Sequence, residues 1–488
     1  NSRRFSFPYV SGFPLRLLAS LLEYVPGLSS YLYNNMVLST LRDRSFKEDM
    51  TMMPLPLPKE IFGVEDSVII DGLEIIEQKN QEHNPAPANQ RFLCARDYTD
   101  AYFTKSITPI QVCEKLIDKI KQSCSKACDP PLYGMCQYHE DDIRAQAEAS
   151  TSRYNQNQTF GPLDGVPVAI KDSIDVIGYE TRVGTSFLNQ GNPASKDAFL
   201  VNKLREQGAI IIGKTNLHEI CFDVTTNNPN AYTSRNPYNT DHYCGGSSGG
   251  SGCVVASGLC PISVGSDIGD PEDSKTLYQP SPTLHGLYLT KTLSDLKIGI
   301  FSDWNRRVVD PAITSSLNSL INEFKLRGAE FIEIDIPELN DAQIAHSITA
   351  LSEFCSFMNG YKECLHLLSL PNRANIATYS NANASDYIKA QQVRTRMMRN
   401  ASVLFSGVNL ILTPTCAITA PPIYPESLIY GEINPSVTTY GVRFTKLANF
   451  IGIPAVTVPA GYNDKNLPIG LQFMAKWYDE ATLLRVAK

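Results

Sequence analysis

The sequence lacks any stretch that reaches the roughly 20 consecutive apolar residues of a membrane-spanning helix. It also lacks runs of lysine or arginine. Its 43 basic residues are outnumbered by 50 acidic ones, and the net charge is −7. Because proteins that bind nucleic acid place clustered basic side chains against phosphates, this balance argues against a nucleic-acid partner. Charged residues make up only 19% of the chain and hydrophobic residues 43%, which argues against global disorder and predicts a large core.

The 12 cysteines of the chain lack the paired spacing of a metal site. Cys124 and Cys128 are four residues apart, but no second pair with ligand spacing accompanies them. The cysteines are scattered through the chain, as small core residues are in proteins of a reducing compartment. We therefore expect an intracellular protein without a structural zinc site.

Residues 11–36 (SGFPLRLLASLLEYVPGLSSYLYNNM) come nearest to a long apolar segment. Apolar side chains recur at helical spacing at Phe13, Leu17, Leu18, Leu21, Leu22 and Val25. Pro26–Gly27 then interrupts the pattern, which predicts a helical hairpin. Two interpretations stay open: a hairpin packed on the protein's own core, or an interfacial segment that contacts a membrane or caps a channel for an apolar substrate.

The sequence divides into two regions that differ in composition and in hydrophobic pattern. Residues 1–92 comprise the apolar hairpin and an arm rich in proline and charge, which we expect to lie extended over the body. Residues 93–488 show no clear linker, and strand and helix signals alternate from Val166 onward, which predicts an α/β fold with helices on both faces of a sheet. The expected strands are 166–170, 209–213, 260–265, 296–301, 329–337 and 408–413, and the expected helices include two within 96–123 and others at 196–208, 249–258, 311–328 and 384–405.

Three short motifs resemble known functional sites, but the rest of the sequence lacks the other residues that those sites require. The string VAIK at 168–171 matches the lysine motif of protein kinases, but the glycine-rich loop follows it instead of preceding it, and neither HRD nor DFG occurs. Residues 246–250 match G-x-S-x-G, the nucleophile turn of α/β hydrolases, which needs a later histidine as base. His285, His346 and His366 do follow, but each lies in ordinary helical or linker sequence. The glycines also resemble a phosphate-binding loop, but neither Lys-Ser nor Lys-Thr follows them.

Lys171 ends an expected strand whose five preceding residues, VPVAI, are all apolar. A buried lysine is costly unless it is paired or neutral. Burial lowers the pKa of a lysine, so such a side chain can act as a base near neutral pH. The alternative is a lysine at the strand end whose amine reaches the surface and pairs with a carboxylate. The spacing alone leaves both interpretations open.

Five stretches, in this order along the chain, together resemble the amidase signature family. They are GPLDGVPVAIKDSIDV (161–176), GAIIIGKTNLHE (208–219), GGSSGGSGCVVASGLCPISVGSDIG (245–269), LILTPTCAITAPP (410–422) and ANFIGIPAVTVPAGYNDKNLPIGLQFMA (448–475). The likeness covers about 93–488 and implies a large mixed, twisted β-sheet between layers of α-helices, with an N-terminal helical extension. Within the family the chain is most similar to the plant-type fatty acid amide hydrolases, through its N-terminal region and residues 96–112 and 384–398.

The resemblance implies a catalytic triad of serine, cis-serine and lysine. Lys171 matches the family's lysine. Ser247, the first serine of GGSSGG, matches the bridging serine, whose preceding peptide bond, here Gly246–Ser247, is cis in the family. Backbone N–H groups of Ile268 and Gly269 would belong to the oxyanion hole. The residues that would organise the site or line its pocket are Ser248, Asp267 and Cys221.

The nucleophilic serine of that triad has no match in this sequence. In the family it comes directly after a second glycine turn, which is present here as Gly265–Gly269. Asp270 and a charged linker sequence follow instead, and we do not expect Ser274 within that linker to replace it. Either the sequence joins two parts of a longer chain at this point, or the chain has lost its nucleophile. A true deletion would remove core strands and expose the apolar faces of their neighbours, which favours the first interpretation.

The activity that the resemblance implies is hydrolysis of fatty acid amides or N-acylethanolamines to a free fatty acid and an amine, with no metal or cofactor. We expect a homodimer inside the cell that binds a lipid amide and contacts an internal membrane peripherally through residues 11–36. The alternatives are an amidase of other small or aryl amides, a transamidase subunit that serves aminoacyl-tRNA, and a non-catalytic scaffold with the amidase fold. The acidic net charge and the apolar N-terminus argue against the RNA-related alternative.

Overall fold

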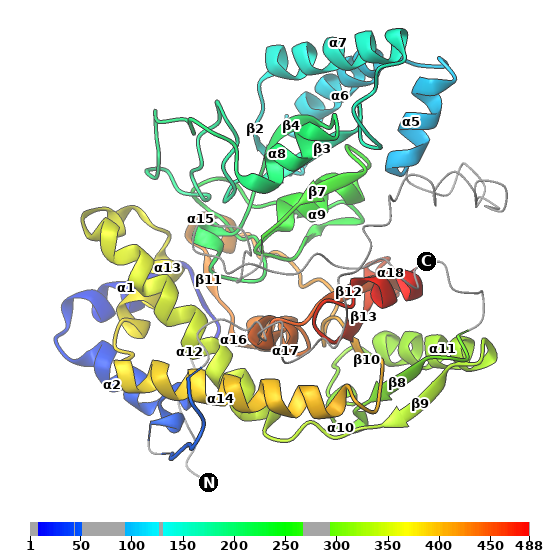
Figure 1. Cartoon of the computed structure of the whole chain (residues 1–488). Coiled ribbons are helices and arrows are strands. Elements are labelled where there is room, and N and C mark those ends of the chain that lie inside the picture. The colour runs from blue at the N-terminus through cyan, green and yellow to red at the C-terminus, as the bar shows by residue number, and fades with distance from the viewer. Residues whose placement is uncertain (1–7, 43, 51–92, 126–129, 267–292, 488) are drawn as a thin grey trace.

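A four-stranded sheet holds the lysine-bearing strand in its interior. The computed structural model describes residues 8–42, 44–50, 93–125, 130–266 and 293–487 (Figure 1). The strands are β2 (Met135–Gln137), β3 (Pro167–Lys171), β4 (Ile210–Thr215) and β7 (Ile262–Val264). Their order is β2-β4-β3-β7, with β3 parallel to β4 and β7, and β2 antiparallel to β4. Every residue of β3 and β4 is buried, as expected for parallel strands covered on both faces.

Helices cover both faces of this sheet. They are α6 (Pro109–Ser123), α7 (Glu140–Gln156), α8 (Phe199–Glu206) and α9 (Gly249–Ala256). Because side chains alternate along a strand, Ala169 of β3 packs with α6, α7 and α9 in one core cluster. Val168 and Ile170 point to the opposite face and pack with α8. The α/β class expected from the alternating pattern is therefore confirmed.

A second sheet of five strands forms the core of the C-terminal half. Its order is β12-β13-β10-β8-β9, with β8 parallel to β9 and β10, and β13 antiparallel to β10 and β12. Helices α11 and α18 pack on one face, and α12, α14 and α17 pack on the other (Figure 1). The elements are β8 (Lys297–Ile300), β9 (Glu330–Glu333), β10 (Leu410–Pro414), β12 (Ala455–Tyr462), β13 (Pro468–Ala475), α11 (Pro311–Leu326), α12 (Leu339–Met358), α14 (Ala384–Leu404), α17 (Lys446–Ile451) and α18 (Glu480–Ala487).

Each of the two sheets has two edge strands, which are β2 and β7 in the first sheet and β12 and β9 in the second. Among the described residues, β7 pairs only with β3, and β12 pairs only with β13. The side chains of β12 alternate between exposed and half-buried, whereas those of β10 are all buried. Edge strands present free backbone N–H and C=O groups, which natural proteins usually cover or pair.

The N-terminal hairpin expected from the sequence is present as α1 (Gly12–Tyr24) and α2 (Leu28–Asn35). The chain turns at Gly27, whose φ of 79° lies in the left-handed region that glycine adopts readily. On the inner face of α1, Leu15 and Ala19 are fully buried and belong to one cluster with Ala374. Helix α1 packs in this way on α13 (Leu370–Tyr379).

Shorter elements connect these layers. They are β1 (Val10–Ser11), η1 (Val37–Leu41), α5 (Ala95–Phe103), η2 (Glu219–Cys221), β5 (Arg235–Asn236), β6 (Asn239–Tyr243), α10 (Ser302–Asn305), η3 (Asn359–Leu367), α15 (Ser427–Tyr430), β11 (Glu432–Ile433) and α16 (Pro435–Gly441). Within the described ranges, no helix combines the length and the apolar character needed to cross a bilayer. Most of the expected arm, 51–92, lies outside the described residues.

Candidate active site

Lys171 and the glycine–serine loop meet at the carboxyl ends of β3 and β7. Lys171 is the last residue of β3, and its side chain has no exposed surface. Its Nζ donates a hydrogen bond to Ser247 Oγ at 2.8 Å and another to the carbonyl oxygen of Ser266 at 3.2 Å. Because Ile170 is in register with Val264 in the parallel pair, the chain leaving β7 passes directly over the lysine. The amine of Lys171 is therefore buried among oxygen atoms of serine residues.

The loop that carries Ser247 is held close to the body of the protein. The Gly246–Ser247 peptide bond is cis, as the family resemblance implied. Two glycines of the loop are required by close packing, because a Cβ at Gly249 would collide with Thr226 Oγ1 and one at Gly250 with the carbonyl oxygen of Asn216. Both glycines lie in the first turn of α9. Because they have no side chain, the loop and the start of the helix can pack closely against Thr226 and Asn216.

Of the other predicted site residues, the structure describes Ser248 and Cys221. Ser248 lies beside Ser247 and donates from Oγ to the Ser266 carbonyl at 3.2 Å, the same oxygen that Lys171 contacts. Cys221 ends η2 and is partly buried; its backbone N–H donates to the carbonyl of His218 at 2.8 Å. Asp267, Ile268 and Gly269 lie outside the described residues, and so does Ser274.

Three hydroxyl side chains at the site were not singled out from the sequence. Ser173 Oγ and Ser266 Oγ are 3.0 Å apart. The carbonyl oxygen of the same Ser266 accepts a hydrogen bond from Lys171 Nζ. Thr226 Oγ1 donates to the Gly245 carbonyl at 2.7 Å, which places it directly behind the loop of Ser247. Ser173 follows Lys171 by two residues, and this proximity in sequence was the one signal that could have identified it as a site residue. Thr226 is 21 residues away in sequence from the serine it supports, and only tertiary structure brings the two together.

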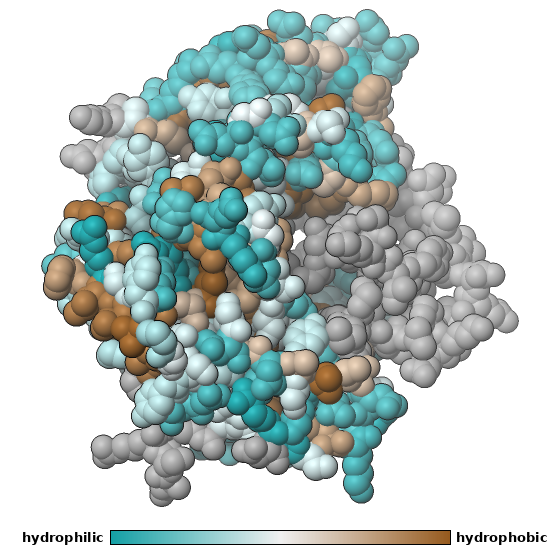
Figure 2. All heavy atoms as spheres, turned by 90° about the vertical axis from the view of Figure 1, so that its left-hand side faces the viewer, coloured by the Kyte–Doolittle hydropathy of each residue, from teal (hydrophilic) through white to brown (hydrophobic). Residues whose placement is uncertain are grey.

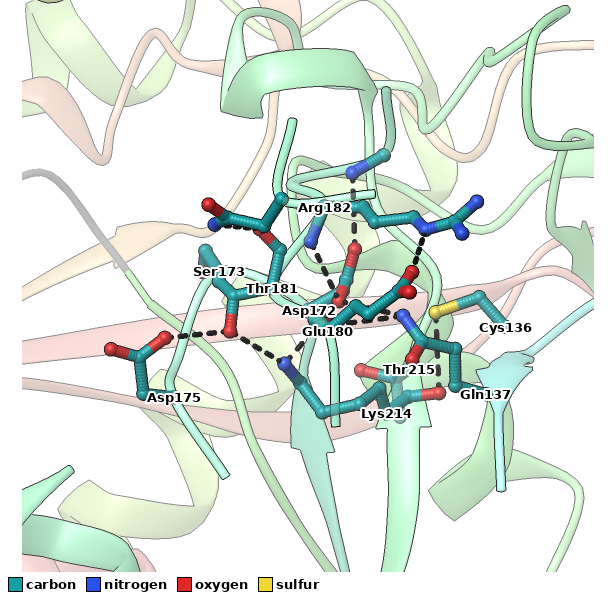
Figure 3. Close-up of polar contacts among 12 residues, drawn as sticks. Cys136, Gln137, Asp172, Ser173, Asp175, Glu180, Thr181, Arg182, Lys214 and Thr215 are labelled. Carbon is teal, nitrogen blue, oxygen red and sulfur yellow. Dashed lines mark hydrogen bonds and ion pairs between the residues drawn. The ribbon is translucent and has the colours of Figure 1, made fainter. Parts of the chain in front are cut away.

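A second buried lysine lies next to the first. Lys214 of β4 has no exposed surface and forms an ion pair with Asp172 at 3.3 Å, and its Nζ also donates to Thr181 Oγ1 at 3.3 Å (Figure 3). Burial raises the pKa of the Asp172 carboxyl, and the charge of Lys214 together with the N–H group of Gly184 partly offsets this effect. Asp172 directly follows Lys171 in the chain, so the pair anchors the end of β3.

A cavity of about 780 Å³ adjoins this ion pair. Its walls include Asp172, Gln137 and Arg182, and the stacked rings of Tyr133 and Tyr232, whose centroids are 4.5 Å apart. Gln137 donates from Nε2 to the Glu180 carbonyl at 2.9 Å, and Arg182 pairs with the Glu180 carboxylate (Figure 3). The described lining residues of this cavity include neither member of the Lys171–Ser247 pair, so the cavity lies beside the lysine–serine contact.

The described residues contain no group of three or more histidine, cysteine or acidic side chains that could hold a metal ion. A buried amine in contact with a serine hydroxyl can pass a proton to or from that hydroxyl.

Comparison with known proteins identifies the relatives of this chain. The family model described as Amidase matches residues 118–271 and 270–484. A fatty acid amide hydrolase of Medicago truncatula is 31% identical over 571 residues, which cover 98% of this chain and 92% of that protein.

Two solved structures share the fold. A bacterial aryl acylamidase that belongs to the amidase signature family has a TM-score of 0.68 at 21% identity, over 82% of this chain and 95% of that one. A protein from a vestigial complex that reveals the origins of an s-triazine catabolic enzyme has a TM-score of 0.72 at 22% identity, over 81% and 97% of the two chains. With the family model and the Medicago relative, these findings establish that the chain belongs to the amidase signature family of amide hydrolases.

Proposed function

We propose that this protein hydrolyses long-chain fatty acid amides, including N-acylethanolamines, through Lys171, Ser247 and a nucleophilic serine that follows Gly269. The observation that carries the proposal is the 2.8 Å contact between Lys171 Nζ and Ser247 Oγ at a fully buried lysine. In the proposed mechanism, Lys171 is the base that accepts the proton of Ser247, since burial of an amine disfavours its charged form.

In the proposed reaction, Ser247 Oγ gives its proton to Lys171 Nζ and takes one from the nucleophilic serine. The oxygen of that serine bonds to the amide carbonyl carbon, and N–H groups of Ile268 and Gly269 stabilise the oxyanion, as the family resemblance implies. The carbon–nitrogen bond then breaks, and the relay returns its proton to the leaving amine. Water attacks the acyl ester by the same relay, which releases the fatty acid and regenerates the serine.

Two observations support a nucleophile on residues absent from the printed sequence. The two matches of the family model meet at 270–271, where the family pattern stops. The alignment with the Medicago relative spans 571 residues, more than the 488 of this chain, so that relative holds residues without a counterpart here.

The proposed substrate class rests on the relatives and on the apolar surface of the hairpin. The outer face of α1 exposes Phe13, Leu17 and Leu21 to 73%, 50% and 39%. Figure 2 shows hydrophobic side chains gathered on this side of the molecule. We propose that this outer face contacts a lipid surface, where apolar area is removed from water while the inner face stays packed on α13. A homodimer inside the cell stays a prediction.

The proposal is tested with Lys171→Ala in the full-length protein. Hydrolysis of a fatty acid amide should fall by about 10²–10⁴-fold, because a general base contributes that much to rate. The thermal unfolding temperature of the variant is measured in parallel, so that misfolding is recognised. Lys203→Ala, which removes an exposed lysine of α8, is the matched control and should keep full activity. Full activity of Lys171→Ala would refute the relay.

A fluorophosphonate probe identifies the nucleophile itself. The probe should label a serine in a peptide that follows Gly269 and is absent from the printed sequence, as read by peptide mass spectrometry. Labelling should disappear in Lys171→Ala, since the serine is then no longer activated. A protein that stays unlabelled and yields one contiguous peptide across Gly269–Asp270 would instead be a non-catalytic scaffold.

A further inference from the structure

Thr226 is a buried threonine directly behind the Ser247 loop. It has no exposed surface and belongs to the segment between η2 and β5. Its backbone has φ 59°, in the left-handed region that β-branched residues rarely adopt. A residue whose backbone is held in such a conformation by its surroundings is often found at a functional site.

The hydroxyl of Thr226 contacts the chain on both sides of Ser247. It donates to the Gly245 carbonyl at 2.7 Å and lies 3.3 Å from the Ser247 carbonyl. It also accepts a hydrogen bond from the backbone N–H of Gly249 at 3.0 Å, at the start of α9. The hydroxyl therefore donates its one proton toward these carbonyls and accepts one hydrogen bond.

The main chain of Ser247 is therefore restrained from two directions. Its carbonyl oxygen accepts from the His218 N–H at 3.0 Å and lies within reach of Thr226 Oγ1. The loop also packs tightly on this threonine, because a Cβ at Gly246 would lie only 2.7 Å from the Thr226 nitrogen. With the backbone held, the side chain of Ser247 points its Oγ at Lys171 Nζ, at 2.8 Å.

We propose that Thr226 is a positioning residue of the active site, whose hydroxyl keeps Ser247 Oγ within proton-transfer distance of Lys171 Nζ. The inference rests on the proposed function, because it assigns Thr226 a part in the same proton relay. Thr226 itself does not touch the reacting atoms. Since proton transfer requires heavy atoms within hydrogen-bond distance, a displacement of about 1 Å in the loop is expected to slow the reaction by up to about a hundredfold.

The test compares Thr226→Val with Thr226→Ser in the full-length protein. Valine keeps the shape and the β-branch but removes all three contacts of the hydroxyl, whereas serine keeps the hydroxyl. We expect kcat for a fatty acid amide to fall about ten- to a hundredfold in Thr226→Val, with KM within twofold of the parent value, and to recover to within about threefold in Thr226→Ser. Thr378→Val removes an equally buried hydroxyl that bonds only within α13 and should leave kcat unchanged.

Several outcomes would overturn the inference. They are an unchanged kcat in Thr226→Val, an equal loss in Thr226→Val and Thr226→Ser, or an equal loss in Thr378→Val. If Thr226→Val does not fold, Thr226→Ala carries the same expectation with a smaller side chain.

A crystal structure of the variant is the second measurement, and it needs no substrate. Ser247 Oγ should lie beyond hydrogen-bond distance from Lys171 Nζ, and an unchanged 2.8 Å contact would refute the inference. This measurement stands even if the parent protein hydrolyses no fatty acid amide, a result that would refute the proposed function alone.

Discussion

Lys171 and Lys214 are two fully buried lysines on neighbouring strands, and their surroundings differ. Lys214 forms an ion pair with the Asp172 carboxylate at 3.3 Å. Lys171 donates to a serine hydroxyl and to a serine carbonyl, the environment that we propose for a base. Residue type and burial are the same at both positions, so the neighbouring oxygen atoms determine which lysine is structural.

The structural role of Lys214 predicts a loss of stability when its charge is removed. Lys214→Met leaves the Asp172 carboxylate buried without its cation, and the free energy of unfolding should fall by about 3–5 kcal/mol. Denaturant unfolding measures this change. The double variant Asp172→Asn/Lys214→Met removes both charges and should recover part of the loss. Equal stabilities of Lys214→Met and the parent would show that the ion pair contributes nothing.

At the scale of elements, the short strand pair β1–β11 joins the N-terminal hairpin to the rest of the molecule. Ser11 is in register with Glu432, whose side chain is 5% exposed. Burial raises the pKa of Glu432 to about 7, and the nearby charge of Asp223 adds to the rise. Its Oε2 has no hydrogen-bond partner among the described residues. A carboxyl group that is partly neutral at physiological pH therefore lies at the junction of the hairpin and the catalytic domain.

This carboxyl group predicts a pH-dependent stability. The folded protein binds the proton of Glu432 more tightly than the unfolded chain, whose ordinary pKa is 4.5, so stability should fall as pH rises from about 4.5 to about 7. The loss is at most about 3 kcal/mol. Glu432→Gln should remove this contribution and be more stable than the parent at pH 8. Unfolding free energies at pH 5 and pH 8 measure the difference, with exposed Glu323→Gln as the control; equal pH profiles of parent and Glu432→Gln would contradict the prediction.

At the scale of the whole molecule, the hairpin has an inner face that the protein covers and an outer face that it leaves exposed. Leu15, Ala19 and Leu22 are buried against the body. Phe13 and Leu17 are at least half-exposed, as are Tyr24 and Tyr31 at the end of α1 and on α2. Figure 2 shows hydrophobic residues gathered on this side of the molecule, and exposed apolar surface of this kind is typical of interaction sites.

The outer face predicts binding to lipid vesicles. The parent protein should float with phosphatidylcholine vesicles, and Phe13→Ser/Leu17→Ser should weaken this partitioning by tenfold or more, because burial of a large apolar side chain contributes about 1.5–3 kcal/mol. Leu15→Ala is the control on the inner face of the same helix. It should lower stability and leave vesicle binding of the folded protein unchanged. A parent protein that does not float would contradict the lipid contact.

Much of this architecture follows from local sequence patterns. The apolar runs around Val168 and Ile211 became the buried strands β3 and β4, and Pro26–Gly27 separates α1 from α2 as expected. The family pattern placed Lys171 and Ser247, which the structure brings to 2.8 Å. These predictions succeed because strand and helix periodicities are local, and because glycine and proline restrict the backbone at the positions where they occur.

Tertiary structure decided the rest. Periodicity identified an apolar hairpin, but only packing on α13 determined that Leu22 faces inward and Phe13 outward. The contacts of Lys214 with Asp172, and of Thr226 with the Ser247 loop, join residues that are 42 and 21 positions apart. The physical reason is that burial, charge pairing and hydrogen bonding depend on which atoms meet in space. The sequence by itself therefore determined the elements and the proposed catalytic pair, and the fold determined which neighbours each side chain contacts.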